Sequence, residues 1–438
     1  MAADQSVTLT ADRSAALTAD QKRGFLAAWG GWALDGMDAS IYALVLSPAL
    51  TELLPRSGIE VSQGTVGYYG SVLQALFLLG WGLSMVWGPI SDRIGRVRAL
   101  MLTILCYSLF TFLCGLVTNI WQLAALRIFV GLGIGGEQPV GAAYIAEELS
   151  ESQRKLGAGL MHTGYYFGFF FASVANYVIG ANYGWRWMFV FGGVPALLIG
   201  FIRYGVREST KWQARVSDKT RARPAMRDAV VTIFSPAYLR RTIVMSGLFL
   251  VSIIGLWAGS IYVPTATTQL AVRGGAGAAE AARQASYGGM VLAFGTIVGC
   301  VAAPLIAERL GRRKAMALYF ALMGVSILFA FGYVFYLPAS ALSLFYWCIL
   351  LLGLGGANFA LYTLWLPEQY PTDCRASAIA FISSVGRFVG VAMVFLVGAG
   401  IRSYGSLGVP VAVTAVAFIF GLLLLPLTEE TRGRSLPA

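Results

Sequence analysis

The chain has 438 residues, of which 57% are hydrophobic and only 12% are charged. Soluble domains carry about 25% charged residues, so this composition excludes an ordinary soluble protein and predicts a chain embedded in a membrane. A net charge of +11 is also typical of nucleic-acid-binding proteins. Here, however, the basic residues lie mainly in short segments on one side of the predicted membrane, which excludes that class.

Twelve apolar runs are long enough to cross a bilayer, since a helix needs about 20 apolar residues to span the hydrocarbon core. They predict an all-α membrane protein with six transmembrane helices in each of two bundles. In chain order, the predicted spans are 25–50, 66–87, 99–117, 120–146, 157–180, 186–205, 242–264, 286–307, 315–336, 342–366, 377–400 and 408–427. The predicted regions are an N-terminal tail (1–24), a first bundle (25–205), a linker (206–240), a second bundle (241–427) and a C-terminal tail (428–438).

Basic residues between the spans predict the orientation of the chain. Clusters at 93–98, 206–240 and 309–314 would face the cytoplasm under the positive-inside rule, which places both chain ends there. Residues 265–285, rich in Ala, Gly and Thr, are predicted to form a loop on the outer side. Residues 1–22 lack the basic start and apolar core of a cleavable signal peptide. We therefore expect the first span to direct insertion into the plasma membrane, or into the inner membrane of a bacterium.

The sequence lacks the patterns of enzymes and metal proteins. Its five cysteines lie mostly inside apolar runs without ligand-like spacing, so neither a disulfide nor a metal site is predicted. It also contains no nucleophile–base set and no phosphate-binding glycine loop. We therefore expect a protein that is not an enzyme and that needs no cofactor other than a coupling proton.

A charged turn after the second predicted span recurs, in weakened form, after the eighth. The first copy is Gly88-Pro-Ile-Ser-Asp92-Arg93-Ile-Gly95-Arg96 and the second is Leu305-Ile-Ala-Glu308-Arg309-Leu-Gly311-Arg312. Acid matches acid, base matches base and glycine matches glycine. Further along, Gly131-Leu-Gly133 recurs as Gly353-Leu-Gly355, and residues 147–154 align with 368–375. These repeats predict two homologous halves related by pseudo-symmetry, a plan common in transporters.

Across nearly its whole length the chain resembles the major facilitator superfamily, whose signature is the loop at 88–98. Further matches are Arg127 in the fourth span, the Pro-Glu-Gln-Tyr-Pro-Thr run at 367–372, and Glu430-Thr-Arg-Gly-Arg-Ser-Leu at 430–436. Within that superfamily, two motifs resemble proton symporters for aromatic acids, sialate and small carboxylates. They are Asp35-Gly-Met-Asp38 in the first span and Gly135-Gly-Glu137 in the fourth.

Three acids inside predicted spans are candidates for proton coupling. A charge in hydrocarbon costs about 2.5–3.5 kcal/mol even on lenient insertion scales, so each needs a reason. Asp35 and Asp38 share one helix face, and burial beside a second carboxylate favours the protonated form that coupling requires. In the alternative interpretation, one of them is a permanently ionised partner of Arg127. Glu137 is either a second proton relay or the partner of a base on the cytoplasmic side.

Two arginines inside predicted spans are candidates for binding an anion. Arg387 lies in the middle of the eleventh span with no acid near it in sequence, and its planar fork matches a carboxylate. The alternative is that it reaches a helix end or an acid from another span. Arg127 either alternates between Asp35 and the substrate or forms a fixed ion pair. The remaining candidates for the substrate cavity are Tyr42, Gln74, Tyr165, Tyr166, Trp257, Tyr262, Asn358, Tyr362 and Trp365. His162, the only histidine, is interpreted as a pH sensor or as a simple polar contact.

The repeated charged turn is a candidate gate between the halves. What the resemblance implies is that Asp92 interacts with the second half at the cytoplasmic end of the eleventh span, with Glu308 and Arg309 acting likewise for the other half. Topology signalling by positive charge is the alternative. The candidate gating residues are Gly88, Asp92, Arg93, Gly95, Arg96, Glu308, Arg309, Gly311 and Arg312.

Together these features predict a monomeric secondary active transporter that takes up a small organic anion with protons by rocking-switch alternating access. A sugar or polyol proton symporter is the main alternative, because residues 207–212 and 430–436 resemble the linker and tail of sugar porters. Arg387 argues against it, since a neutral sugar does not need a buried cation. A drug–proton antiporter and a receptor without flux are weaker alternatives. The expected partners are the lipid bilayer, the organic anion and protons, with no nucleic acid.

Overall fold

The computed structural model describes residues 18–148, 151–197, 199, 205, 207–208, 231–338, 341–370 and 372–433. Within them the chain is built from helices joined by turns, with no strand. The helices before the linker are α1 (Ala19–Arg56), α2 (Gln63–Leu83), η1 (Ser84–Val86), α3 (Trp87–Ile94), α4 (Arg96–Cys114), α5 (Ile120–Glu148), α6 (Glu151–Ala175), η2 (Asn176–Gly180), α7 (Ala181–Tyr183), α8 (Trp185–Phe191) and η3 (Val194–Leu197). The helices after it are α12 (Leu239–Ile253), η4 (Ile254–Gly259), η5 (Ser260–Tyr262), α13 (Val263–Arg273), α14 (Ala278–Leu310), α15 (Arg312–Gly332), η6 (Val334–Tyr336), α16 (Ala341–Gly356), α17 (Asn358–Trp365), η7 (Leu366–Glu368), α18 (Thr372–Tyr404), α19 (Gly408–Val413), α20 (Val416–Leu424) and η8 (Leu425–Leu427).

These helices confirm the predicted all-α membrane fold. Nine helical stretches in the described ranges are long and apolar enough to cross a membrane. The three other predicted spans correspond to α5, to α6 with η2, and to α8 with η3. The predicted outer loop at 265–285 was wrong, because α13 continues to Arg273 and α14 begins at Ala278. Its Ala and Thr residues continue these helices, and only the glycine-rich stretch between them forms a turn.

The repeated glycines Gly95 and Gly311 have the same structural role. Gly95 (φ 105°) separates α3 from α4, and Gly311 (φ 89°) separates α14 from α15. Positive φ values of this kind are accessible to glycine without steric cost, which explains why the residue recurs at both turns. The sequence repeat therefore corresponds to a repeated helix–turn–helix geometry.

A glutamate from a distant segment caps the helix that follows each of these turns. Glu208 accepts hydrogen bonds from the backbone N–H groups of Arg96 (2.8 Å) and Val97 (3.1 Å) at the start of α4. Glu430 accepts them from Arg312 (2.9 Å) and Arg313 (3.1 Å) at the start of α15. Burial by itself would raise the pKa of Glu430, but these backbone donors, with two more from the residues after it, lower its pKa below the usual range.

The second glycine repeat fixes how the helices pack within each bundle. A methyl group at Gly131 would overlap the carbonyl oxygen of Phe77 in α2, and one at Gly353 would overlap that of Leu292 in α14. Two residues further on, Gly133 lies against the backbone of α4, as Gly355 does against that of α15. Thus α5 packs between α2 and α4 as α16 packs between α14 and α15.

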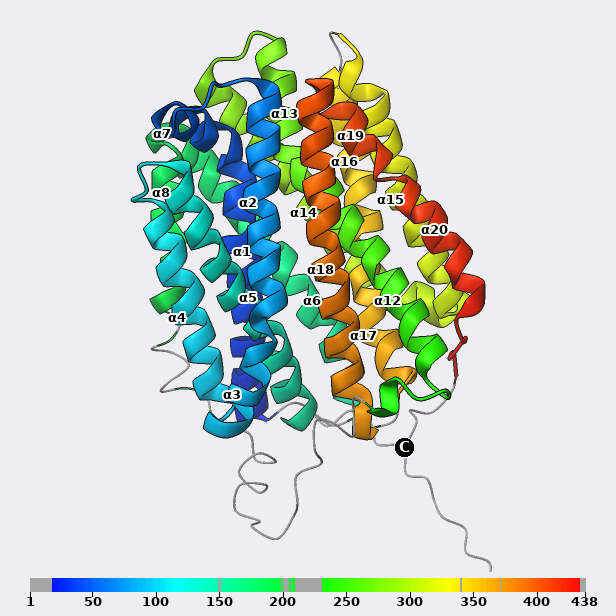
Figure 1. Cartoon of the computed structure of the whole chain (residues 1–438). Helices are drawn as coiled ribbons and strands as arrows, with labels where there is room; N and C mark the ends of the chain where they lie inside the picture. The colour runs from blue at the N-terminus through cyan, green and yellow to red at the C-terminus, as the bar shows by residue number, and fades with distance from the viewer. Residues whose placement is uncertain are drawn as a thin grey trace, which may run out of the picture.

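The two bundles stand side by side, with α2 against α18 and α6 against α14 (Figure 1). Contacts between them include the end drawn at the top of Figure 1, which holds α7 and α13. There the hydroxyls of Ser71 and Tyr262 meet across the interface, and the Asn176 amide donates to the Ser286 hydroxyl (3.0 Å). The upper end of the interface is thereby closed by direct side-chain contacts.

Candidate functional site

Three buried polar side chains converge inside the first bundle, one each from α1, α4 and α5. Asp35, Glu137 and Tyr107 are each at most 1% exposed. The Asp35 carboxyl group faces that of Glu137 within hydrogen-bonding reach, and the Tyr107 hydroxyl points toward Glu137. Among the described residues, no donor serves any of the four carboxylate oxygens. The structure thus pairs Asp35 with Glu137 rather than with Asp38.

The absence of a side chain at Gly31 makes this pairing possible. Gly31 lies one helical turn before Asp35 on α1, and a methyl group there would overlap the Glu137 carboxyl group. The neighbouring Gly30 has no heavy atom within 4 Å of the position where a Cβ would stand. Of the two adjacent glycines, only Gly31 leaves room for a functional group.

Asp38 has a different environment, although it lies on the same helix as Asp35. One of its oxygens accepts a hydrogen bond from the Thr111 hydroxyl of α4 (2.8 Å). Its other oxygen has no hydrogen-bond donor among the described residues. The positive charge of Arg127 acts on Asp38 without forming a direct ion pair with it. Asp38 therefore has both a donor and a nearby cation, and Asp35 has neither.

Arg127 is held by aromatic rings. Its guanidinium lies 4.1 Å from the ring centre of Tyr42 and 4.2 Å from that of Phe77. It donates a long hydrogen bond of 3.5 Å to the Gln74 side-chain oxygen. The side chain is 1% exposed, its Nε has no acceptor, and within the described ranges it forms no ion pair with a carboxylate. A fixed ion pair between Arg127 and Asp35, one of the two alternatives from the sequence, is not formed.

A row of packed aromatic rings connects Arg127 with Arg387, the other buried arginine inside a predicted span. The Arg387 guanidinium lies 4.7 Å from the ring centre of Trp81, and the side chain is 8% exposed. The Trp81 ring packs against Trp257 of the other bundle (5.5 Å), and Phe77 touches both tryptophans. Sequence reasoning identified Trp257 but missed Phe77 and Trp81. Their signal was the spacing, since they follow Gln74 on one face of α2.

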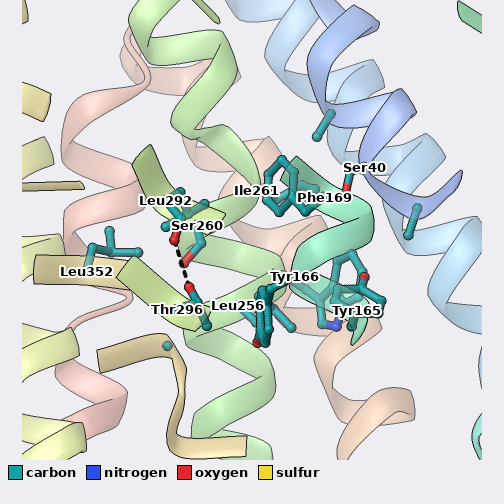
Figure 2. Close-up of a pocket in the computed structure, with 14 residues that line it drawn as sticks. Ser40, Tyr165, Tyr166, Phe169, Leu256, Ser260, Ile261, Leu292, Thr296 and Leu352 are labelled. Atoms are coloured by element: carbon teal, nitrogen blue, oxygen red, sulfur yellow. Dashed lines mark hydrogen bonds between the residues drawn. The ribbon is translucent and has the colours of Figure 1, made fainter. Parts of the chain in front are cut away.

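A small cavity lies between the bundles beside these aromatic rings (Figure 2). Its volume is about 30 Å³, enough for one or two water molecules but not for an organic acid. The predicted residues Tyr165, Tyr166 and Trp257 line it, together with Ser40 and Thr296. Both hydroxyls already donate to carbonyls of their own helices. In this conformation the cavity is therefore closed to an organic acid.

Trp257 reaches the cavity from a distorted stretch of helix. Residues Ile254–Gly259 form a π-helical segment, and a 3-10 turn follows it. Such π-helical turns are rare and occur frequently at functional sites, because the extra residue reorients the side chains around it. On the opposite wall, Tyr165 lies within electrostatic reach of Asp35, Asp38 and both buried arginines. Tyr165 therefore lines the cavity and also lies near the buried charges.

Several of the other predicted cavity residues make packing contacts instead. The Asn358 amide donates to the Gly355 carbonyl oxygen (2.9 Å). Tyr362 pairs with the Ser252 hydroxyl (3.0 Å). Tyr262 belongs to the closed upper end, and the Trp365 indole donates to the backbone of Glu429. His162 stacks on Phe359 of the other bundle, with ring centres 6.3 Å apart.

The gating candidates are described only in part. Gly95 and Gly311 form the turns, and Arg96 donates to the Ser91 hydroxyl (3.1 Å). Arg312 binds Glu368 through two hydrogen bonds of 2.8 and 3.0 Å and forms an ion pair with Glu308 (2.7 Å), all within the second bundle. Arg309 is exposed at the end of α14. Gly88 lies in α3, and the side chains of Asp92 and Arg93 lie outside what the structure describes.

Sequence comparisons identify the family. Residues 28–392 match the sequence model of the Major Facilitator Superfamily. A probable 4-methylmuconolactone transporter of Cupriavidus pinatubonensis is 31% identical over 432 residues, covering 94% of this chain and 91% of the relative. The niacin transporter NiaP of Acinetobacter baylyi is 27% identical, covering 93% of both chains. The sialic acid transporter NanX of Escherichia coli is 26% identical, covering 92% of this chain and 93% of the relative.

Among solved structures, the chain is similar to a partially occluded inward-open conformation of the xylose transporter XylE from E. coli. The TM-score is 0.74 at 18% identity, covering 96% of this chain and 100% of the other. At that identity the likeness shows the fold alone. Because the family model matches most of the sequence and a relative above 30% identity matches nearly all of it, this chain belongs to the Major Facilitator Superfamily and is a multi-pass membrane transporter, not an enzyme.

Proposed function

We propose that this protein carries a small organic acid, as the carboxylate, together with a proton across the plasma membrane by rocking-switch alternating access. The observation that supports it most is Arg127, a fully buried cation that forms no ion pair with a carboxylate among the described residues. An arginine cannot lose its proton at this depth, and a buried charge without a partner is costly. A substrate carboxylate would supply the missing counter-charge.

The surroundings of Arg127 favour a ring-containing acid. Phe77, Trp81 and Trp257 offer flat aromatic faces between Arg127 and Arg387. An acid held by a guanidinium fork could stack its ring on these faces. The relatives named for 4-methylmuconolactone, niacin and sialic acid support an organic acid as the substrate. No observation favours a neutral sugar, since the likeness to XylE extends only to the fold.

Transport requires the closed site to open. The cavity of about 30 Å³ is too small for such an acid, so binding would need the bundles to separate at one end. In the rocking-switch mechanism the upper contacts, such as Ser71 with Tyr262, would break as the lower end closes. The ligand would shift this equilibrium by its different affinities for the two states.

Proton coupling is assigned to Asp35, Asp38 and Glu137, the buried acids of the first bundle. We further propose that both chain ends face the cytoplasm and that the transporter is a monomer. The proposed bounds of its two bundles are residues 25–205 and 241–427. The latch role of the charged turns, with Asp92 and Glu308 as its acids, is part of the same proposal.

A thermal-shift experiment on the purified protein tests the substrate class. Nicotinate, gallate, N-acetylneuraminate and xylose would each be added at pH 5.5 and 7.5. A ligand that binds only the folded protein at 100 times its Kd stabilises it by about 2.7 kcal/mol. We expect stabilisation by a carboxylate, lost in Arg127→Gln and in Arg387→Ala but kept in Arg98→Gln, a control on the exposed surface of α4. Stabilisation by xylose alone would overturn the substrate class.

A further inference from the structure

Asp35 and Glu137 face each other, and no described residue forms a hydrogen bond of normal geometry with either carboxyl group. Both side chains are almost completely buried, and none of their four oxygens receives a hydrogen bond from any described residue. Two ionised carboxylates in contact repel each other strongly at low dielectric constant, and neither would be solvated here. One proton placed between them replaces this repulsion with a short, charge-assisted hydrogen bond.

Tyr107 gives a second, independent indication at the same place. Its side chain is fully buried, and its hydroxyl forms no hydrogen bond of normal geometry with a described residue. It points toward Glu137 from α4, whereas Asp35 approaches from α1. Gly31 leaves open the space that the Glu137 carboxyl group occupies. Three helices thus direct hydrogen-bonding groups at one point.

Asp38 provides the contrast that separates the roles of the acids. Burial opposes ionisation of both acids, but the ionised form of Asp38 accepts a hydrogen bond from Thr111 and lies in the field of Arg127, which partly offset that effect. A donor and a cation favour the ionised carboxylate, whereas the donor-free surroundings of Asp35 favour a protonated pair. The surroundings of two acids one helical turn apart therefore differ in how far they support the ionised form, and such differences divide the roles of paired acids in many acid–base sites.

We infer that Asp35 and Glu137 share a single proton, that this is the coupling proton, and that Asp38, the third of the proposed coupling acids, stays ionised without carrying it. The inference rests on the proposed function for its coupling role. Tyr107 is a positioning residue that donates to Glu137 when the pair loses its proton. Gly31 is required because it leaves space for the pair.

The transport step follows from the environment of the pair. When the site is open, water solvates both carboxylates, and the shared proton leaves to water as hydronium. When the bundles close and expel the water, one carboxylate takes a proton from hydronium, forming an O–H bond and releasing a water molecule. Other titratable or charged groups near the pair are Asp38 of α1, Tyr165 of α6 and, beyond Asp38, Arg127 of α5. Closure around the bound substrate thus takes up one proton, and opening on the other side releases it.

Infrared spectroscopy tests the shared proton without using any substrate. The protein in lipid, at neutral pH in D2O, is compared with three variants through the C=O stretch of protonated carboxyl groups. In Asp35→Asn and Glu137→Gln, the new amide donates to the remaining carboxylate, which can then stay ionised. We expect the infrared difference spectrum, wild type minus variant, to contain the C=O band of a protonated carboxyl group for Asp35→Asn and for Glu137→Gln. The difference spectrum for Asp38→Asn should lack this band. A Glu137→Gln difference without the band, or an Asp38→Asn difference containing it, would overturn the inference.

The same C=O band of the protonated carboxyl group tests the role of Tyr107. Because its hydroxyl stabilises the ionised pair, Tyr107→Phe should move the loss of the band to higher pH during a titration. Tyr319→Phe is a matched control in α15, where the hydroxyl donates to the Gly299 carbonyl oxygen (2.7 Å), and it should leave the titration unchanged. An unshifted titration in Tyr107→Phe would remove Tyr107 from the proton site.

Uptake by proteoliposomes separates this inference from the proposed function. With an inward proton gradient, the wild type should accumulate labelled nicotinate or another acid identified by thermal shift, and Glu137→Gln should lose this accumulation. Undiminished accumulation by Glu137→Gln would refute the coupling role while leaving acid transport intact. A band that behaves as expected in a protein that moves none of the acids would refute the proposed function and leave the shared proton standing.

Discussion

The ion pairs of Arg312 allow one prediction to be worked out quantitatively. Arg312 binds Glu368 through two hydrogen bonds and Glu308 through one ion pair, but side-chain exposure is 10% for Glu368 and 62% for Glu308. Breaking a buried pair costs about 3–5 kcal/mol, and one hydrogen bond to a charged group contributes about 1.5–3 kcal/mol. Glutamine keeps one acceptor oxygen, so we expect Glu368→Gln to cost about 2–3 kcal/mol. Glu308→Gln removes an exposed pair and should cost about 0–1 kcal/mol.

Thermal unfolding of the purified variants in one detergent, at one scan rate, measures the difference. A change of 1 kcal/mol shifts the Tm by about 2–4 °C for units of 150–250 residues, so Glu368→Gln should melt roughly 4–12 °C below the wild type. The double variant should lose more than the sum of the two, because Arg312 is then buried without a carboxylate partner. Equal losses for the two single variants, or a larger loss for Glu308→Gln, would refute the argument from burial.

Three further predictions concern positions where the structure offers an internal comparison. Gly30→Ala should stabilise the protein by up to about 1 kcal/mol, because a Cβ there contacts no other atom. Gly31→Ala should destabilise it by about 1–3 kcal/mol, because the added methyl group overlaps the Glu137 carboxyl group. The Tm should therefore rise for the first variant and fall for the second. Gly133→Ala and Gly355→Ala each place a methyl group against a neighbouring backbone, so both should lower the Tm by a similar amount. The lowered pKa of Glu430 implies stability that is present above the unfolded-state pKa near 4.3 and lost as pH falls through the folded-state pKa, so the Tm difference between wild type and Glu430→Gln should hold from pH 7 to about 5 and shrink as the pH falls below about 4.

The fold was largely predictable because length and hydropathy are sufficient to identify membrane spans. What they do not determine is the hydrogen-bond pattern within a span. The seventh span was predicted as one run, 242–264, but it contains the π-helical turn at Ile254–Gly259. The first predicted span, 25–50, is shorter than α1 (Ala19–Arg56), because a helix continues past the hydrocarbon into polar surroundings. Apolar length reports only the part of a helix that lies in lipid.

The buried charges of the candidate site could be predicted from the sequence, but the residues that contact them could not. Asp35, Glu137 and Arg127 could be recognised because charges in apolar runs are rare. Tyr107 could not, since many tyrosines occur in the spans and nothing in the sequence shows which face of α4 turns inward. Helical spacing suggested pairing Asp35 with Asp38, but the close approach of α1 to α5 at Gly31 pairs Asp35 with Glu137 instead.

The repeat also shows how the two bundles came to differ in chemistry. In the register set by the paired glycines of α5 and α16, Arg127 corresponds to Ile349 and Glu137 to Phe359. In the register of the charged turns, Tyr107 corresponds to Met323. The backbone positions are thus repeated, while the polar groups of the first bundle are replaced by apolar ones in the second.

This asymmetry limits how coupling can work. Asp35, Glu137, Tyr107 and Arg127 belong to one bundle, so rigid-body rocking of the two bundles leaves the distances among them unchanged. The motion changes only their access to water and to groups of the other bundle, such as Arg387. In the proposed mechanism, coupling would therefore act through hydration of the pair, which is favourable for two carboxylates only while the interface beside Tyr165 is open. A substrate that held that interface closed would stabilise the protonated pair, and by linkage the proton would stabilise the bound substrate.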